Sequence, residues 1–92
     1  MENLVAQIAK SLNGHDKDEL YIIVRTEENY AFCCDGRLRM LDNPKKKKLK
    51  HLQVSNYQVD DIKDKIDNAL KLSNSDIREA IEIYKNLNAK GE

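Results

Sequence analysis

The hydrophobic periodicity of the chain changes once, near Ser55, and this change limits the fold more than any other feature of the sequence. Before it, apolar residues alternate or form runs of strand length, and after it they recur every three to four residues. Periods of two and 3.6 residues belong to a β-strand and an α-helix. We therefore predict a mainly β member of the α+β class, with strands within residues 1–54 and a two-helix appendage within residues 55–92.

Two neighbouring segments carry the clearest strand patterns. Residues 20–26 (LYIIVRT) are an apolar, β-branched run of strand length, and residues 30–34 (YAFCC) follow a polar turn. In the second segment, Tyr30, Phe32 and Cys34 fall on one face because side chains alternate along a strand. The two segments are predicted to pair in an antiparallel arrangement.

The next segment is predicted to extend this pair to a three-stranded meander. Asp35-Gly36 favours a type I′ hairpin turn, which needs positive φ at both central positions. Residues 37–41 (RLRML) then alternate, with Arg37 and Arg39 on one face.

Pro44 separates this meander from a lysine run. Proline lacks a backbone donor and pushes the residue before it to an extended geometry. The lysines at 45–48 are therefore expected to leave the sheet as an exposed arm. Residues 49–54 (LKHLQV) are expected to return as a further strand that closes the sheet on itself.

Residues 4–12 (LVAQIAKSL) fit two structures. Ala6, Ala9 and Lys10 favour a helix, and Gly14 stands where a helix C-cap would be. The same segment also suits a first strand whose apolar side chains enter a barrel. Local propensity leans to the helix and leaves the strand open.

Capping signals divide the second part of the chain into two helices. Ser55 and Gln58 fit one capping box, and Ser73 and Asp76 fit another. Neither helix can bury an apolar stripe alone, so the helices are expected to pair as a hairpin, to dock on the sheet, or to do both. The predicted stripes are Val59, Ile62, Ile66, Ala69 and Leu70 in the first helix, and Ile77, Ala80, Ile81, Tyr84 and Leu87 in the second.

Positive charge is concentrated in residues 35–52, although the formal net charge of the chain is zero. This segment holds seven of the sixteen basic residues, four of them consecutive lysines. Consecutive lysines repel one another, whereas a phosphate backbone would favour gathering them, because each neutralised phosphate releases counterions. Arginine forks and lysine point charges together suit such a backbone. A solvated flank that keeps the domain soluble is the other explanation of the run.

The sequence carries no catalytic constellation, so no enzyme, cofactor, metal site or small-molecule substrate is expected. It contains no GxSxG, P-loop or HExxH motif. Asp60 and Asp61 suit the first turn of a helix, where acids stabilise the dipole. Cys33 and Cys34 point to opposite faces of a strand and lack a second pair to complete a zinc site. We expect both to be small hydrophobes in a reducing compartment.

A membrane location is not expected either. No apolar run approaches the ~20 residues of a membrane span, and the N-terminal residues lack the pattern of a signal peptide. These features predict a cytoplasmic protein.

Three segments together resemble a KOW-motif family of small bacterial proteins, which are similar to large-subunit ribosomal proteins of eukaryotes and archaea. They are residues 13–17 (NGHDK), 21–41 (YIIVRTEENYAFCCDGRLRML) and 43–52 (NPKKKKLKHL). The resemblance covers about residues 4–54 and implies a five-stranded, SH3-like barrel of the translation-protein type that binds RNA. It also implies that residues 4–12 are the first barrel strand and that the loop at 13–17 lies at the RNA-contacting edge. Asp18 departs from the family, which more often has a second glycine there.

The expected function is RNA binding in association with the ribosome or translation, with ribosomal RNA as the partner and a ribosomal or accessory protein as a further one. Tyr21 or Tyr30 could stack on a base, although a strand position favours a structural role for each. The alternative is a protein-interaction adaptor, in which the lysines bind an acidic protein or the helices dimerise. The predicted RNA-binding residues are Arg37, Arg39, Lys45, Lys46, Lys47, Lys48 and Lys50, with His51, Lys17 and His15 as additional candidates.

Overall fold

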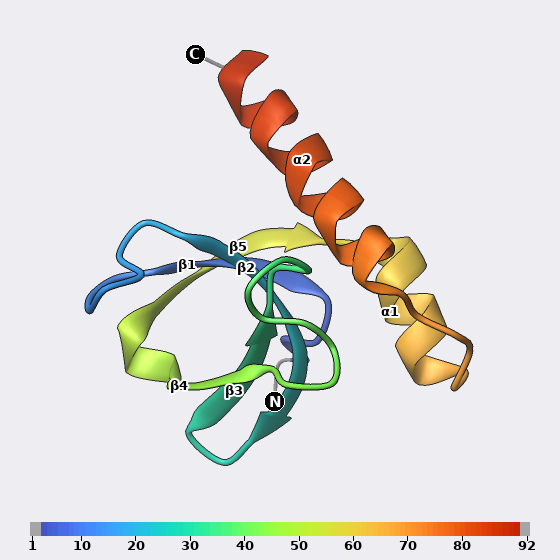
Figure 1. The fold of residues 1–92 in the computed structure, drawn as a ribbon, viewed down its shortest axis with the longest axis horizontal. Coiled ribbons are helices and arrows are strands. Elements are labelled where there is room, and N and C mark those ends of the chain that lie inside the picture. The colour runs from blue at the N-terminus through green and yellow to red at the C-terminus, as the bar shows by residue number, and fades with distance from the viewer. Residues whose placement is uncertain (1–2, 91–92) are drawn as a thin grey trace.

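The computed structural model describes residues 3–90, which form one curved antiparallel sheet and two helices (Figure 1). The strands are β1 (Gln7–Ser11), β2 (Leu20–Glu27), β3 (Tyr30–Cys34), β4 (Lys45–Lys48) and β5 (Leu52–Gln58). A short 3-10 helix, η1 (Leu49–His51), joins β4 to β5, and the helices α1 (Asp60–Asp67) and α2 (Asn74–Lys90) follow. The predicted α+β class, with five strands before two helices, is confirmed.

The strand order is β4-β3-β2-β1-β5, with antiparallel pairing throughout. β4 and β5 are therefore the two edges of the sheet. Within residues 3–90 these edges do not pair with each other, so the sheet curls but remains open. The predicted closure of the sheet on itself is not observed.

The ambiguous N-terminal segment is a strand. β1 lies between two partners, with Ala9 opposite Tyr21 on β2 and Val54 on β5. Ala6 precedes the strand with a φ of 69°, a left-handed conformation that would interrupt a helix through this segment. The strand implied by the family resemblance is confirmed, because pairing on both sides outweighs the weak helix propensity of the residues.

The prediction that residues 37–41 form a strand is wrong. The Asp35 carboxylate accepts hydrogen bonds from the backbone N–H groups of Arg37 and Arg39, both at 2.9 Å. The carbonyl of Arg39 in turn accepts the N–H groups of Asp35 and Gly36. These bonds close a local loop in place of a strand ladder, and Leu38 is 87% exposed. The third strand of the meander is instead β4, so the lysines form an edge strand and not an arm.

The segment after the lysines also differs from the prediction. Residues 49–51 form η1, and β5 runs on to Gln58, so the expected capping box of Ser55 and Gln58 is wrong. The Gln58 side-chain amide donates to the carbonyl of Val5, which ties the end of β5 to the start of β1. Helix α1 begins at Asp60 after Val59, with no side-chain cap. Asp60 and Asp61 do occupy its first turn.

The second capping box is confirmed. The Ser73 N–H donates to the Asp76 carboxylate at 3.0 Å, and the Asp76 N–H donates to the Ser73 hydroxyl at 3.2 Å. The reciprocal bonds satisfy two backbone donors at the start of α2, where a lowered pKa of Asp76 reflects chiefly the Ser73 backbone bond. This local pattern therefore predicted the correct helix start.

The core consists of two apolar clusters on opposite faces of the sheet. The helices cover one face, where Ile62, Ile77 and Ile81 pack with Ile8 and Ile22. The boundary predicted after residue 54 falls inside β5, and the helices share this cluster with the sheet. Alternate residues form the second cluster inside the curl of the sheet: Ala9, Tyr21, Ile23, Ala31, Cys33 and Leu52.

The predicted helical stripes are buried only in part. α1 ends at Asp67, so Ala69 and Leu70 lie beyond it, and Leu70 is 56% exposed. In α2, Leu87 is 51% exposed because this helix extends past the sheet (Figure 1). Neither α1 nor α2, as described within residues 3–90, has the length and apolarity that crossing a bilayer demands.

Candidate nucleic-acid interface

The four lysines of β4 divide into two pairs because side chains alternate across a strand. Lys45 and Lys47 point into the curl of the sheet, where their side chains are 31% and 8% exposed. Lys46 and Lys48 are on the outer face and are exposed. The predicted exposure of the whole run is therefore wrong for Lys47, which is among the most buried polar residues of the described chain.

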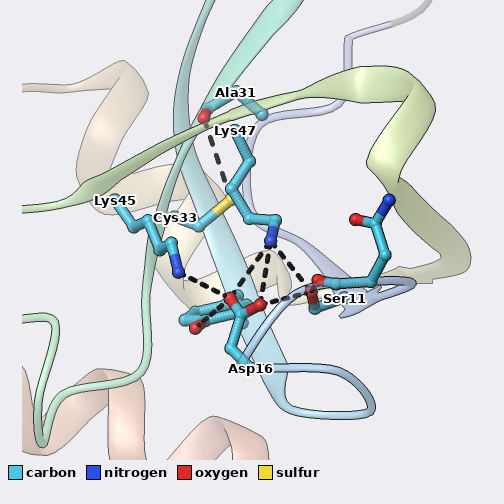
Figure 2. Close-up of polar contacts among 8 residues, drawn as sticks. Ser11, Asp16, Ala31, Cys33, Lys45 and Lys47 are labelled. Atoms are coloured by element: carbon cyan, nitrogen blue, oxygen red, sulfur yellow. Dashed lines mark hydrogen bonds and ion pairs between the residues drawn. The ribbon is translucent and has the colours of Figure 1, made fainter.

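Asp16 holds the two inward lysines (Figure 2). Its carboxylate accepts hydrogen bonds from Lys47 Nζ at 3.0 and 3.1 Å and from Lys45 Nζ at 3.0 Å. The hydroxyls of Ser11 and Tyr21 donate to the same carboxylate, each at 2.8 Å. Lys47 Nζ also donates to Ser11 Oγ at 2.9 Å. We call these five side chains the Asp16 cluster.

The Asp16 cluster joins two ammonium groups to one carboxylate, so its formal charge is +1. Burial would raise the pKa of Asp16, but its hydrogen bonds with Lys45, Tyr21, Ser11 and Lys47 outweigh this effect and hold the pKa well below its usual range. Burial and the neighbouring carboxylate raise the pKa of Tyr21. The two lysines therefore neutralise an internal carboxylate, and the ammonium of Lys47 is not presented to solvent.

The outer face of β3 has a different character. Tyr30 and Phe32 project outward and are half-buried, whereas Ala31 and Cys33 project into the curl. Lys46 Nζ lies 4.4 Å from the centroid of the Tyr30 ring and 5.9 Å from that of Phe32. Tyr30, Phe32 and Cys34 lie on the same face of the sheet, as predicted. The helices cover this face at Cys34 and do not cover the two rings.

A β-bulge brings Arg25 to this outer face. The pairing between β2 and β3 shifts by one residue, from Ile23 opposite Cys33 to Arg25 opposite Phe32. Such a shift reverses which side chains point outward. The Arg25 guanidinium consequently lies 3.9 Å from the Phe32 ring centroid, with its side chain 61% exposed. We call Arg25, Tyr30, Phe32, Lys46 and Lys48 the outer β3 face.

The remaining predicted residues surround this sheet in three places. His15, Lys17, Arg39 and Lys45 line one hollow, together with the acidic residues Asp16, Glu19 and Asp35. Lys50 lies beside Lys48 and Tyr30 in another hollow, and Arg37 lies in a third with Arg78. His51 is half-buried in η1. The first hollow is therefore mixed in charge, while the second joins the outer β3 face.

The two thiols have structural positions. Cys33 and Cys34 are both buried and unpaired, and they belong to the clusters on opposite faces of the sheet, as predicted. Burial raises the pKa of Cys33 to about 12 and that of Cys34 to about 11. Neither thiol is a reactive thiolate at neutral pH.

Sequence reasoning did not single out Asp16, Ser11, Arg25 or Phe32 as parts of these sites. Strand alternation could have grouped Phe32 with Tyr30 and the outward lysines. No local signal predicts the bulge that turns Arg25, nor the meeting of Asp16 with lysines 29 and 31 residues further along the chain.

Comparison with the models of known protein families gives no match, and comparison with curated proteins gives none either.

Proposed function

We propose that this protein is a non-enzymatic RNA-binding module that associates with the ribosome or with translation, and that its curled sheet is an incompletely closed relative of the SH3-like barrel of the KOW type. The strand order and the resemblance of the lysine-rich segment to KOW proteins support this proposal. Ribosomal RNA is the expected partner, in the cytoplasm.

One observation carries the proposal: the exposed lysines on and next to β4 form no ion pair with the described part of the protein. Among the ion pairs of residues 3–90, none involves Lys46, Lys48 or Lys50. These three cations lie near one another around Tyr30. Exposed, gathered and unneutralised ammonium groups favour a polyanion, because binding releases the counterions condensed on its phosphates.

The proposed phosphate contacts are accordingly narrower than the whole basic segment. Lys46, Lys48 and Lys50 make the principal contacts, joined by Arg25 from β2. Arg37, Arg39, His15 and Lys17 supply further contacts from the loops. Lys45 and Lys47 act mainly inside the protein, where they are already engaged by Asp16.

The salt dependence of binding to an RNA hairpin tests this function. If three to five of these groups contact phosphates at the same time, the log–log slope of affinity against salt should be about −2 to −4. Lys46→Ala/Lys48→Ala should weaken binding and reduce the slope by about 2. Lys71→Ala/Lys85→Ala is the matched control, since it removes the same charge from two exposed positions, Lys71 in the loop before α2 and Lys85 on α2, where an exposed ion pair with Glu82 is worth little. Absence of binding by the unmodified protein, or equal loss in both double variants, would contradict the proposal.

Self-association through α2 is the second candidate function. Ile83 and Leu87 lie one helical turn apart and are 47% and 51% exposed, which suits a helix-to-helix contact. Sedimentation of the unmodified protein and of Ile83→Glu separates this function from a monomeric RNA-binding module. A dimer that the substitution dissociates would favour the interaction adaptor.

A further inference from the structure

Resting on the proposed RNA binding, we infer that the outer β3 face stacks unpaired bases, so that its ligand is single-stranded RNA. The rings of Tyr30 and Phe32 supply the stacking surface, and the cations around them hold the adjoining phosphates.

The placement of side chains on β3 motivates this inference. The small residues Ala31 and Cys33 fill the interior, while the two large aromatic residues project outward and are only half-buried. The helices cover the same outer face at Cys34 but do not extend over the rings. Neither ring belongs to one of the two apolar clusters of the core, and a half-buried aromatic pair offers apolar faces to a ligand.

The geometry suits successive bases. Tyr30 and Phe32 are two residues apart on one strand, so their positions are separated by roughly 7 Å. Tyr30 can therefore receive one base, and the Arg25 guanidinium that lies on Phe32 can receive the next, in an extended strand. Aromatic rings accept any base because every base has a π-face, and a positively charged groove beside them follows the backbone.

Arg25 extends this platform. Its guanidinium lies 3.9 Å from the Phe32 ring centroid and 3.8 Å from the carboxylate of Glu27, and its side chain is 61% exposed. Guanidinium planes themselves stack on bases, so a base can lie on Arg25 in a continuous stack with Phe32. Two ammonium groups for the phosphates come from β4, on the side of β3 opposite Arg25. Lys46 lies over the Tyr30 ring, and Lys48 is paired with Tyr30 in the sheet.

A duplex cannot use this surface in the same way. Its bases are already stacked on one another, and an A-form helix presents phosphates, hydroxyls and base edges to a protein. The lysines would meet both forms of RNA, whereas the rings would act only on unpaired bases. Selectivity for the single strand is therefore the distinguishing property.

The experiment compares a fluorescently labelled 12-nucleotide single strand of mixed sequence with a hairpin of equal phosphate number, by anisotropy at one salt concentration. The loop of the hairpin is a non-nucleotide linker, so that all its bases are paired. The unmodified protein should prefer the single strand. Tyr30→Leu/Phe32→Leu should weaken single-strand binding by about 30-fold or more, at about 1 kcal/mol or more for each of two bases, and change hairpin binding by less than about 3-fold. Tyr30→Phe/Phe32→Tyr should retain the affinity, since it keeps both rings. Arg25→Lys, which keeps the charge but loses the plane, should weaken the single strand more than the hairpin.

A second measurement needs no variant. A single strand carrying 2-aminopurine should change its fluorescence when the unmodified protein binds it, because a stacked base is quenched differently from a free one. Equal affinity for the two RNAs, or an unchanged 2-aminopurine signal in the bound strand, would overturn the stacking inference while leaving RNA binding intact. Failure to bind either RNA would overturn the proposed function as well.

Discussion

Replacement of Asp16 by asparagine removes the one carboxylate that holds both inward lysines. The substitution keeps the volume of the side chain but leaves the ammonium of Lys47 without a counter-charge, on a side chain that is only 8% exposed. Removing one partner of a buried ion pair typically costs about 3–5 kcal/mol. Because Ser11 still accepts a bond from Lys47, and Lys45 is 31% exposed, we expect a loss at the lower end, about 3 kcal/mol.

This loss would be a large share of the stability of the chain. A domain of this size is stable by roughly 5–15 kcal/mol. Urea denaturation followed by circular dichroism at pH 7 measures the change, which corresponds to a fall in Tm of roughly 12–24 °C. Asp42→Asn is the matched control, because Asp42 is an exposed acid in a loop and its neutralisation should change stability by less than about 0.5 kcal/mol.

Lys47→Met is the complementary substitution at the same ion pair. Lys47→Met removes the buried charge while Asp16 keeps Lys45, Tyr21 and Ser11 as partners. It should therefore cost less than Asp16→Asn, about 1–2 kcal/mol. An Asp16→Asn protein within about 1 kcal/mol of the unmodified one, or a greater loss from Lys47→Met, would refute the assignment of Asp16 as the organising charge.

The same structure makes three further predictions. The pKa of Asp16 is lowered in the folded state, so its carboxylate stabilises the fold above about pH 4, and this stabilisation is lost as the pH falls further. The urea midpoint of the unmodified protein should therefore drop steeply below about pH 4, and that of Asp16→Asn less steeply. An undiminished drop in the variant would count against this account. Ser73→Ala should cost about 1 kcal/mol by removing the α2 cap, whereas Ser75→Ala, on an exposed side chain, should cost less than half of this in the same denaturation assay. Truncation after Val59 should give a fragment that aggregates in sedimentation, because the apolar cluster beneath the helices loses its cover. A soluble, folded fragment would show that the helices are an independent appendage.

Local pattern predicted those elements whose hydrogen bonds and packing are themselves local or strongly periodic. β2 and β3 are β-branched or alternating runs, and the capping box of Ser73 and Asp76 spans four residues. Residues 37–41 also alternate, but the prediction failed because the Asp35 side chain binds the backbone that a strand would have used. The alternating pattern does not reveal such a competing hydrogen bond from a side chain to the backbone.

The candidate site was predictable in composition but not in arrangement. The basic segment was recognised from its charge, yet the sequence does not indicate which of four identical residues is buried. That difference depends on β4 being an edge strand of the sheet and on Asp16 reaching across from another loop. The bulge that turns Arg25 onto Phe32 likewise arises from the pairing of two strands, not from either segment alone.

The position of β4 at the rim of the sheet has a consequence for solubility. A rim strand offers unpaired backbone groups that a second copy of the chain can extend into an intermolecular sheet, and charged side chains, lysine above all, oppose this addition. The lysines of β4 therefore act as gatekeepers against aggregation whether or not RNA is present. Neutralising them should promote self-association in concentrated solution, and the surface proposed to capture RNA is also the one that keeps copies of the protein apart.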